Sequence, residues 1–254
     1  MHVILTGATG LVGSAALEAM IKAQDITKIS ILSRRPVPMA DAAKDPRINV
    51  ILHKDFEKYD SEVLKQLRGA KGCVWALGIS QSKVDKDTYV KITKDYAIEA
   101  AKAFSTLSDS EAEPFRFVYV SGNGATQNPG LFSPLFAGVK GETETILSEM
   151  DAKTPRLRVD SPRPAAVDAT QHPSIQPYIP DPGAAYKVAM ALLGPPIRTF
   201  YKSGHSPTPM LGEFLTKLAM NKFDDGRIAA APGAWKLGPS WVLENTAIRN
   251  MMGL

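Results

Sequence analysis

The sequence has 254 residues, of which 44% are hydrophobic and 22% are charged, and its formal net charge is +4. This balance is ordinary for a folded globular protein and excludes a disordered or fibrous chain. The basic residues are scattered rather than gathered into a stripe with aromatics between them, so we expect no nucleic-acid partner.

Short runs rich in β-branched residues alternate with longer helical patterns over the first 160 residues. This alternation predicts βαβ units and a parallel sheet. The predicted strands are Val3–Leu5, Lys28–Leu32, Ile48–Leu52, Gly72–Ala76, Arg116–Val120 and Arg156–Asp160. The predicted helices between them are Leu11–Ala23, Ser61–Leu67, Asp87–Leu107 and Pro134–Met150. We therefore expect an α/β fold with a doubly wound parallel sheet over residues 1–160.

The composition of the chain changes after Asp160: prolines become frequent, and strand and helix patterns no longer alternate regularly. Three helical patterns remain, at Ala184–Leu193, Met210–Met220 and Val242–Met251. We interpret residues 161–254 as a small Pro-rich C-terminal subdomain that faces the substrate. It is expected to pack on the core as one structural unit with it.

Three glycines, Gly7, Gly10 and Gly13, lie between the first strand and the first helix. The first permits a tight turn, the second lets the backbone approach a pyrophosphate, and the third lets helix and strand pack closely. The helix N-terminus then directs its free amides at the phosphates. This arrangement predicts a Rossmann dinucleotide site, with Thr9, Leu11 and Val12 contributing beside the glycines.

The second strand ends at Ser33-Arg34-Arg35. An NAD-selective enzyme usually places a carboxylate here to bind the ribose hydroxyls. The guanidinium groups of Arg34 and Arg35 match a phosphate instead, which favours NADP(H) over NAD(H).

Two further loops follow strands at the cofactor edge. Asp55 and Phe56 come after the third strand, where a loop commonly binds the adenine of the cofactor. Asp55 could equally be an aspartate that forms a turn. The small residues Ala76-Leu77-Gly78 follow the fourth strand and suit a loop against the cofactor's ribose and phosphates.

The chain resembles the atypical short-chain dehydrogenases/reductases, and within them the Tat-interacting oxidoreductase-like family, which is related to the NmrA-like proteins. The motifs that carry the resemblance extend over nearly the whole chain: Thr6–Gly13, Ser33–Arg35, Asp55–Lys58, Ala76–Gly78, Asp95-Tyr96, Val120-Ser121, Lys140–Glu142, Arg163-Pro164, Ser203–Ser206 and Leu243–Ile248. The resemblance implies a Rossmann fold that binds NADP(H). It places the nicotinamide end near Ser121, Lys140 and a loop containing Pro164, Ala165 and Val167.

In active members of this family a serine polarises the substrate carbonyl, and a tyrosine four residues before a lysine donates the proton. Ser121 and Lys140 match, but Phe136 occupies the tyrosine position. A phenyl ring has no proton to give, and positioned acid–base catalysis is worth about 10²–10⁴-fold. Lys140 can still bind the ribose, and Ser121, Asn123, a water or a residue of the tail could supply the proton.

The remaining polar candidates have simpler interpretations. Cys73 is the single cysteine, lies in an apolar run, and is expected to be a small buried hydrophobe in a reducing compartment. The four histidines show no metal-ligand spacing, so we expect no metal site. His172 and His205 are interpreted as packing or surface residues, although either could act as a general acid.

The apolar N-terminus is interpreted as a first strand rather than a secretion signal, and no apolar run is long enough to span a bilayer. We expect a soluble cytoplasmic protein, with mitochondrial or nuclear association left open. The long helices Asp87–Leu107 and Pro134–Met150 could pair in a homodimer.

The sequence is compatible with three functions. The first is an NADP(H)-dependent oxidoreductase, weak or specialised because of Phe136, that reduces a small apolar carbonyl compound. The second is a catalytically retired NADPH-binding regulator or scaffold of the NmrA-like kind. The third is a non-redox enzyme that uses the cofactor-bound fold for its shape.

Overall fold

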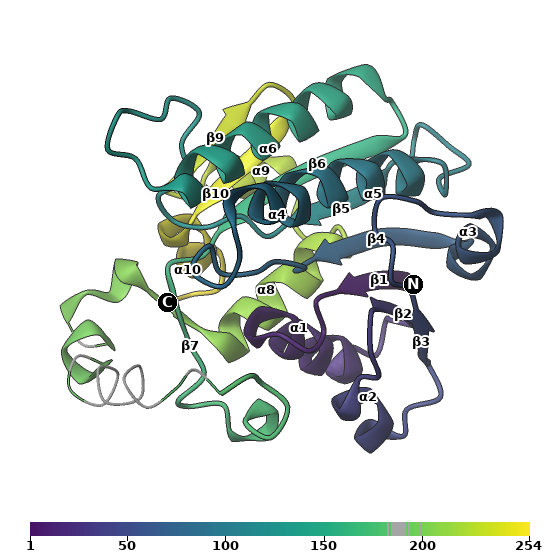
Figure 1. Cartoon of the computed structure of the whole chain (residues 1–254), viewed down its shortest axis with the longest axis horizontal. Helices are drawn as coiled ribbons and strands as arrows, with labels where there is room; N and C mark the ends of the chain where they lie inside the picture. The colour runs from purple at the N-terminus through teal and green to yellow at the C-terminus, as the bar shows by residue number, and fades with distance from the viewer. Residues whose placement is uncertain (182, 184–191, 193, 199) are drawn as a thin grey trace.

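An eight-stranded sheet forms the centre of the computed structural model, in the order β3-β2-β1-β4-β5-β6-β10-β9 (Figure 1). The structure describes residues 1–181, 183, 192, 194–198 and 200–254. Every pairing in this sheet is parallel except that of β10 with β9. The strands are β1 (His2–Thr6), β2 (Lys28–Ser33), β3 (Ile48–Leu52), β4 (Ala70–Trp75), β5 (Phe115–Tyr119), β6 (Leu157–Arg163), β9 (Ala234–Leu237) and β10 (Ser240–Glu244). The predicted doubly wound α/β fold is confirmed.

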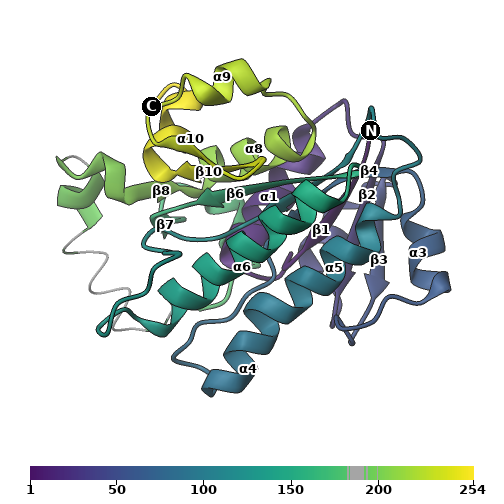
Figure 2. The ribbon, with the colours of Figure 1, turned by 90° about the horizontal axis from the view of Figure 1, so that it is seen from above.

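Helices cover both faces of the sheet (Figure 2). On one side lie α1 (Leu11–Lys22), α2 (Pro38–Ala43), α8 (Thr208–Ala219), α9 (Asp225–Ala229) and α10 (Asn245–Met251). On the other lie α3 (Ser61–Leu67), α5 (Tyr96–Ser105) and α6 (Leu135–Lys153), with α4 (Lys86–Val90) leading into α5.

The two faces of β1 supply two separate hydrophobic cores. Val3 and Leu5 pack with α1 and α8, whereas Ile4 points to the side of α3 and α5. Successive side chains of a strand point to opposite faces, so a strand covered on both sides is apolar throughout. This explains why β1 is apolar at every position from Val3 to Leu5.

The helical patterns are confirmed in part. The predicted helix Asp87–Leu107 is divided into α4, a π-helical turn (Lys91–Asp95) and α5. The pattern Met210–Met220 corresponds to α8, and Pro134–Met150 corresponds to α6. The pattern Ala184–Leu193 lies outside the described residues apart from Leu192.

The prediction of a helix over Val242–Met251 was wrong at its start. Residues 242–244 belong to β10, which pairs in parallel with β6 and antiparallel with β9, and only Asn245–Met251 is helical. The apolar run of β10 passes into α10 without a glycine or a proline between them, so a helical period fits both. The tail therefore contributes two strands to the main sheet, which the six predicted strands did not include.

Other parts of the tail build the edge of the sheet where the parallel strands end. A short parallel pair joins β7 (Ala166–Asp168) to β8 (His205–Pro207). Two 3₁₀ turns, Pro173–Ile175 and Lys202–Gly204, lie between these two strands in the sequence.

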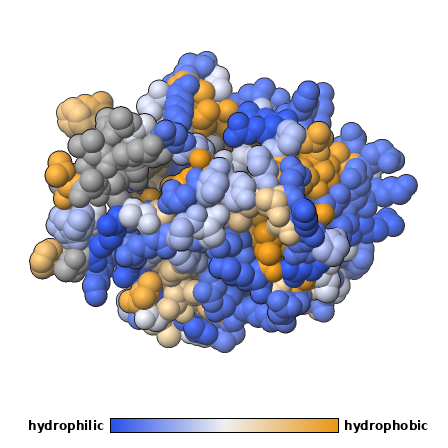
Figure 3. All heavy atoms as spheres, turned by 90° about the horizontal axis from the view of Figure 1, so that it is seen from below, coloured by the Kyte–Doolittle hydropathy of each residue, from blue (hydrophilic) through white to orange (hydrophobic). Residues whose placement is uncertain are grey.

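Figure 3 shows one face of the molecule, which is largely hydrophilic with separate apolar patches. The large exposed hydrophobic side chains include Leu131, Phe132 and Phe200. Across the described part of the chain, no helix combines the length and the apolar character needed to cross a bilayer.

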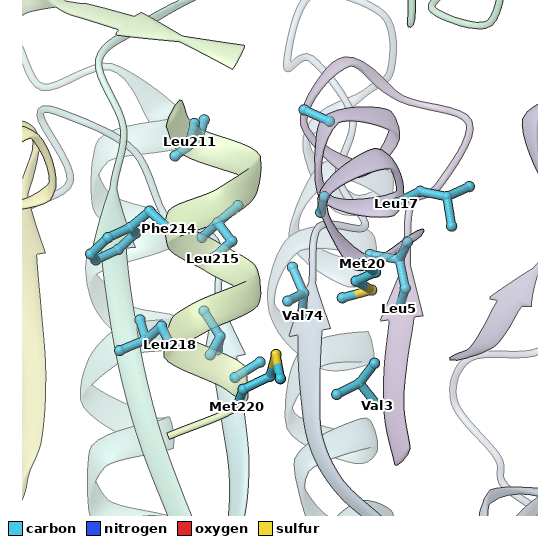
Figure 4. Close-up of a cluster of buried hydrophobic side chains, with 14 of the residues drawn as sticks. Val3, Leu5, Leu17, Met20, Val74, Leu211, Phe214, Leu215, Leu218 and Met220 are labelled. Atoms are coloured by element: carbon cyan, nitrogen blue, oxygen red, sulfur yellow. The ribbon is translucent and has the colours of Figure 1, made fainter. Parts of the chain in front are cut away.

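The tail helix α8 packs directly against α1, with a cluster of apolar side chains between them and the sheet (Figure 4). Leu17 and Met20 of α1 and Leu215 and Leu218 of α8 are all buried there. Gly212 allows this close approach, because a Cβ at that position would lie 2.3 Å from the carbonyl oxygen of Ala15.

We predict that Gly212→Ala destabilises the protein by about 1–3 kcal/mol, since the added methyl must push the two helices apart. The matched control is Gly138→Ala in α6, where a Cβ would meet Pro129 at an ordinary 3.4 Å. That change is expected to be neutral or to stabilise by up to about 1 kcal/mol through helix propensity. Urea unfolding measures both. Equal stability of the two variants would contradict the packing described here.

Candidate cofactor site

The glycine turn between β1 and α1 is closed by contacts that only glycine permits. Gly7 has a φ of +71°, and a Cβ there would lie 2.2 Å from the carbonyl oxygen of Ala76. A Cβ on Gly13 would lie 2.0 Å from the carbonyl oxygen of Gly7. The amide of Gly10 donates to the carbonyl of Gly7 at 2.8 Å. The first and third glycines therefore have the packing roles that their spacing predicted.

The N-terminus of α1 carries free donors. The helix begins at Leu11, its first turn contains no acidic residue, and no side chain caps it. The first amides of a helix have no partner within the helix, and the dipole adds partial positive charge there. Gly10, Leu11 and Val12 line a cavity at this end, so the helix terminus faces open space suited to an anion.

A hollow of about 390 Å³ lies on one side of the glycine turn. The guanidinium of Arg35 donates to the hydroxyl of Thr9 at 3.2 Å, and the Ser33 hydroxyl donates to the Arg35 carbonyl at 2.7 Å. Arg34 and Arg35 are both exposed at the rim. The lining consists of Gly7, Thr9, Leu32, Ser33, Arg34, Arg35, Phe56 and Leu77.

Asp55 has a turn-forming role. Its carboxylate accepts a hydrogen bond from the backbone amide of Glu57 at 3.0 Å, and it is absent from the lining of the hollow. The neighbouring Phe56 is fully buried and supplies the wall of the hollow in its place.

A larger cavity of about 680 Å³ lies on the other side of the turn. It is lined by the residues predicted for the nicotinamide end, which are Ser121, Lys140, Pro164, Ala165 and Val167, and by Phe136. It is also lined by residues predicted to contact the phosphates and the ribose: Gly10, Leu11, Val12, Ala76, Leu77 and Gly78. Leu77 lines both hollows, so the two spaces adjoin at the end of β4. The sequence motifs did not indicate the lining residues Ile79, Ser80, Thr93, Tyr119, Gly122 and Tyr201.

Lys140 is held by backbone carbonyls at the base of this cavity. Its ammonium donates to the carbonyl oxygen of Ser121 at 2.7 Å and to that of Val120 at 3.4 Å. Burial lowers the pKa of Lys140 to about 8, although the nearby Glu144 opposes this shift. The hydroxyl of Ser121 is buried and has no hydrogen-bond partner among the described residues. A buried hydroxyl without a partner is the kind of group that a ligand satisfies.

Phe136 lies one helical turn before Lys140 on α6 and lines the same cavity. Its backbone amide donates to the side-chain carbonyl of Gln81 at 2.9 Å. Its ring lies near Gly124, where a Cβ would be 3.8 Å from the ring. The ring therefore forms an apolar wall at the place where the family's tyrosine would present a hydroxyl.

A buried ion-pair network holds the end of β6, directly before the loop that begins at Pro164. Arg163 donates to Glu144 at 2.9 Å and to Glu244 at 2.8 Å, and its guanidinium lies 5.3 Å from the ring of Trp235. Glu144 is fully buried, and Gln127 also donates to it. This network joins α6, β6 and the β9–β10 hairpin of the tail.

The loops around the cavity are connected by hydrogen bonds. The amide of Asn123 donates to the carbonyl of Pro164 at 2.8 Å, and the amide of Ala165 donates to the hydroxyl of Ser206 at 2.9 Å. Ser206 in turn donates to the side chain of Asn245 at 2.6 Å. Two motifs of the tail that lie forty residues apart therefore meet behind the cavity.

The histidines of the tail serve other contacts. His172 pairs with Thr208 at 2.9 Å and with Glu18, and His205 pairs with Asp168 at 3.0 Å. Neither lines the large cavity. Cys73 is completely buried, and burial raises the pKa of its thiol. Within the described ranges, no group of three or more metal-ligating side chains occurs.

Comparison with characterised sequences gives relatives over most of the chain. The chain is 45% identical over 158 residues to the botcinic acid biosynthesis cluster B protein 16 of Botryotinia fuckeliana, covering 62% of this chain and 99% of that protein. It is 32% identical to the leucinostatins biosynthesis cluster protein T of Purpureocillium lilacinum, and the alignment covers 98% of this chain and 97% of that protein. It is 26% identical to Protein HTATIP2 of Rattus norvegicus, and the alignment covers 63% of this chain and 61% of that protein. No protein-family model matches the sequence.

Solved structures show the same fold. A short-chain dehydrogenase/reductase of Saccharomyces cerevisiae, YIR035C, aligns with a TM-score of 0.62 at 14% identity over 99% of both chains. MoeE5, solved in complex with UDP-glucose and NAD, aligns with a TM-score of 0.59 at 14% identity over 86% of this chain and 72% of its own. The chain belongs to the same family as the leucinostatins biosynthesis cluster protein T, and it has the fold of the short-chain dehydrogenases/reductases.

We predict that Arg163→Met costs about 3–5 kcal/mol of stability, because it leaves the fully buried Glu144 without its cation. Adding Glu144→Gln to this variant is expected to restore part of the loss. The control is Lys102→Met, which removes an exposed pair with Glu99 and is expected to cost less than about 1 kcal/mol. Similar losses from the two single substitutions, measured by urea unfolding, would contradict the structural importance of the network.

Proposed function

We propose that the protein binds NADP(H) and uses it to reduce a small apolar carbonyl compound. The observation that carries the proposal is the pair of hollows that adjoin beside the glycine turn. Two arginines lie at the rim of one hollow, and Ser121 and Lys140 lie in the other. An extended cofactor with a phosphorylated ribose at one end requires positive charge at that end, and the two arginines supply it.

The cofactor's parts correspond to separate groups of residues. The amides of Leu11 and Val12 would bind the pyrophosphate at the start of α1, where the helix dipole favours an anion. The hollow lined by Phe56 and Leu32 would take the adenosine, and the nicotinamide would enter the larger cavity beside Pro164–Val167. A related fold, MoeE5, was solved with NAD bound, which supports a nicotinamide cofactor here.

The arginine pair supports NADP(H) over NAD(H). Guanidinium groups bind phosphate through forked donors, and neither Arg34 nor Arg35 forms an ion pair with a carboxylate in the described part of the chain. Both are therefore open to an added anion. Asp55, the nearest carboxylate in the sequence after β3, is occupied by its own turn.

The chain's own residues provide polarisation and positioning for a reduction. NADPH supplies a hydride when it is bound. The Ser121 hydroxyl would donate a hydrogen bond to the substrate carbonyl and increase the positive character of its carbon. The ammonium of Lys140 has a third N–H beyond its two carbonyl contacts, which would bind the nicotinamide ribose.

The substrate class follows from the walls of the larger cavity. Phe136, Val167 and Ile79 give it an apolar lining, and its volume of about 680 Å³ must hold the nicotinamide end as well as the substrate. Two relatives are named for biosynthesis clusters of botcinic acid and leucinostatins. This supports a substrate that is an intermediate of secondary metabolism, small at the reacting end and largely apolar.

A second function is favoured by one specific observation. The ring of Phe136 replaces the family's proton donor, while the features proposed to bind the cofactor are intact. This combination fits a protein that senses NADPH and signals through a partner. The two functions differ in whether any carbonyl compound is turned over.

We predict that Arg34→Asp/Arg35→Asp abolishes a preference for NADPH over NADH, because two carboxylates would repel the ribose phosphate. Titration of cofactor fluorescence gives both affinities. The control is Arg156→Asp, an exposed arginine before β6, which removes positive charge at a distance from the site. It is expected to keep the preference. If the double variant also keeps it, the arginine pair does not select the cofactor.

We predict that purified protein oxidises NADPH with 4-nitrobenzaldehyde or nonanal, and that Phe136→Tyr raises turnover by adding an acid one helical turn before Lys140. Phe132→Tyr, in an exposed loop, is the matched control and is expected to change nothing. Absorbance at the reduced-nicotinamide band measures the rate. Activity that appears only in Phe136→Tyr would support the regulator and contradict the reductase.

A further inference from the structure

We propose that Tyr201, from the tail, donates the proton that the family's tyrosine supplies at the position of Phe136. The proposal rests on the proposed reductase function and names a catalytic residue for it. Tyr201 lies outside every motif that the sequence offered, and it has no lysine four residues later. Its place in the cavity is the reason to assign it this role.

Tyr201 lines the same cavity as Ser121, Phe136 and Lys140, although it is sixty residues or more away in the sequence. It lies directly before the 3₁₀ turn Lys202–Gly204, which leads into β8, the strand that pairs with β7. Its side chain is 61% exposed, so water can reach the phenol. The residue thus borders both the site and solvent.

The ring of Tyr201 is held in place by the turn that follows it. A Cβ at Gly204 would lie 2.0 Å from the ring, so the ring rests on the glycine backbone. The amide of Gly204 donates to the carbonyl of Tyr201 at 3.0 Å. Asn245 donates to the carbonyl of Ser203 at 2.7 Å, which ties the turn to the start of α10. A phenol held in this way has a restricted orientation, as a proton donor requires.

The other tyrosine of the cavity lining has a different role. The hydroxyl of Tyr119 donates to the backbone carbonyl of Thr93 at 3.3 Å, and the ring is almost completely buried. Burial raises the pKa of this phenol far above its usual range, which makes it a poor acid. Of the two tyrosines in the lining, Tyr201 is the one whose phenol has no hydrogen-bond partner among the described residues.

The chemistry balances with Tyr201 as the acid. A bound NADPH would supply a hydride to the carbonyl carbon and would become NADP⁺, and the electron pair of the C=O π bond would move to oxygen. That oxygen takes the proton from the Tyr201 hydroxyl to give the alcohol, and the resulting phenolate recovers a proton from water. A phenol is a far better proton donor than the aliphatic hydroxyl of Ser121.

The positive charge of Lys140 supports this transfer. A cation in the same cavity stabilises a phenolate formed during the reaction, as well as the developing alkoxide. The ammonium is fixed by two carbonyls, so its charge stays in the cavity. The arrangement differs from the family's in one respect: the acid and the lysine come from different elements instead of one face of α6.

The test is Tyr201→Phe, measured with NADPH and 4-nitrobenzaldehyde or nonanal. We expect turnover to fall by about 10²–10⁴-fold, with NADPH affinity unchanged within about threefold, because only the proton donor is lost. The control is Tyr178→Phe, a tyrosine of the tail that does not line the cavity. It is expected to keep wild-type turnover. Unfolding midpoints check that both variants are folded.

A rescue variant separates a catalytic role from a structural one. Adding Phe136→Tyr to Tyr201→Phe is expected to restore turnover, since it returns a phenol to the cavity from α6. Wild-type turnover in Tyr201→Phe would overturn the assignment and leave the reductase function standing. A loss that Phe136→Tyr does not rescue would also overturn it. No turnover by the wild-type protein would overturn the reductase function and the donor role together.

Discussion

The close contact of three backbone segments at the glycine turn is the constraint on which the site depends. Gly13 of α1 rests on the carbonyl of Gly7, and Gly7 rests on the carbonyl of Ala76 at the end of β4. No side chain fits between them. As a result, the start of α1 lies at the carboxyl edge of the sheet with its first amides facing a cavity, and residues of the turn line both hollows.

The tail, residues 161–254, forms the rest of the site. Arg163, held by the buried Glu144 and by Glu244 of β10, fixes the end of β6 and the loop that lines the larger cavity. Behind this loop, Ser206 and Asn245 connect β8 to α10. Since these contacts join elements before and after residue 160, the cavity takes its shape from both parts of the chain. The tail's contribution to the main sheet is equally direct, through β10 beside β6.

The sequence predicted the features that depend on local patterns. The first six strands and the glycine turn follow from apolar runs and spacing, because each is determined by a few neighbouring residues. The β9–β10 hairpin was missed, since its strands are short and β10 passes straight into a helix. Tyr201 was missed because it lines the cavity together with residues sixty or more positions away, which no local pattern indicates. Asp55 had two interpretations, and only the observed bond to Glu57 favours the turn.

The central claim is that the two hollows hold one NADP(H) molecule across the glycine turn. A crystal structure with NADP⁺ tests it most directly. The account predicts the pyrophosphate at the amides of Leu11 and Val12, the ribose phosphate between the guanidinium groups of Arg34 and Arg35, and the nicotinamide in the cavity that Lys140 lines. A cofactor bound elsewhere, or crystals that stay free of NADP⁺ at saturating concentration, would contradict the claim.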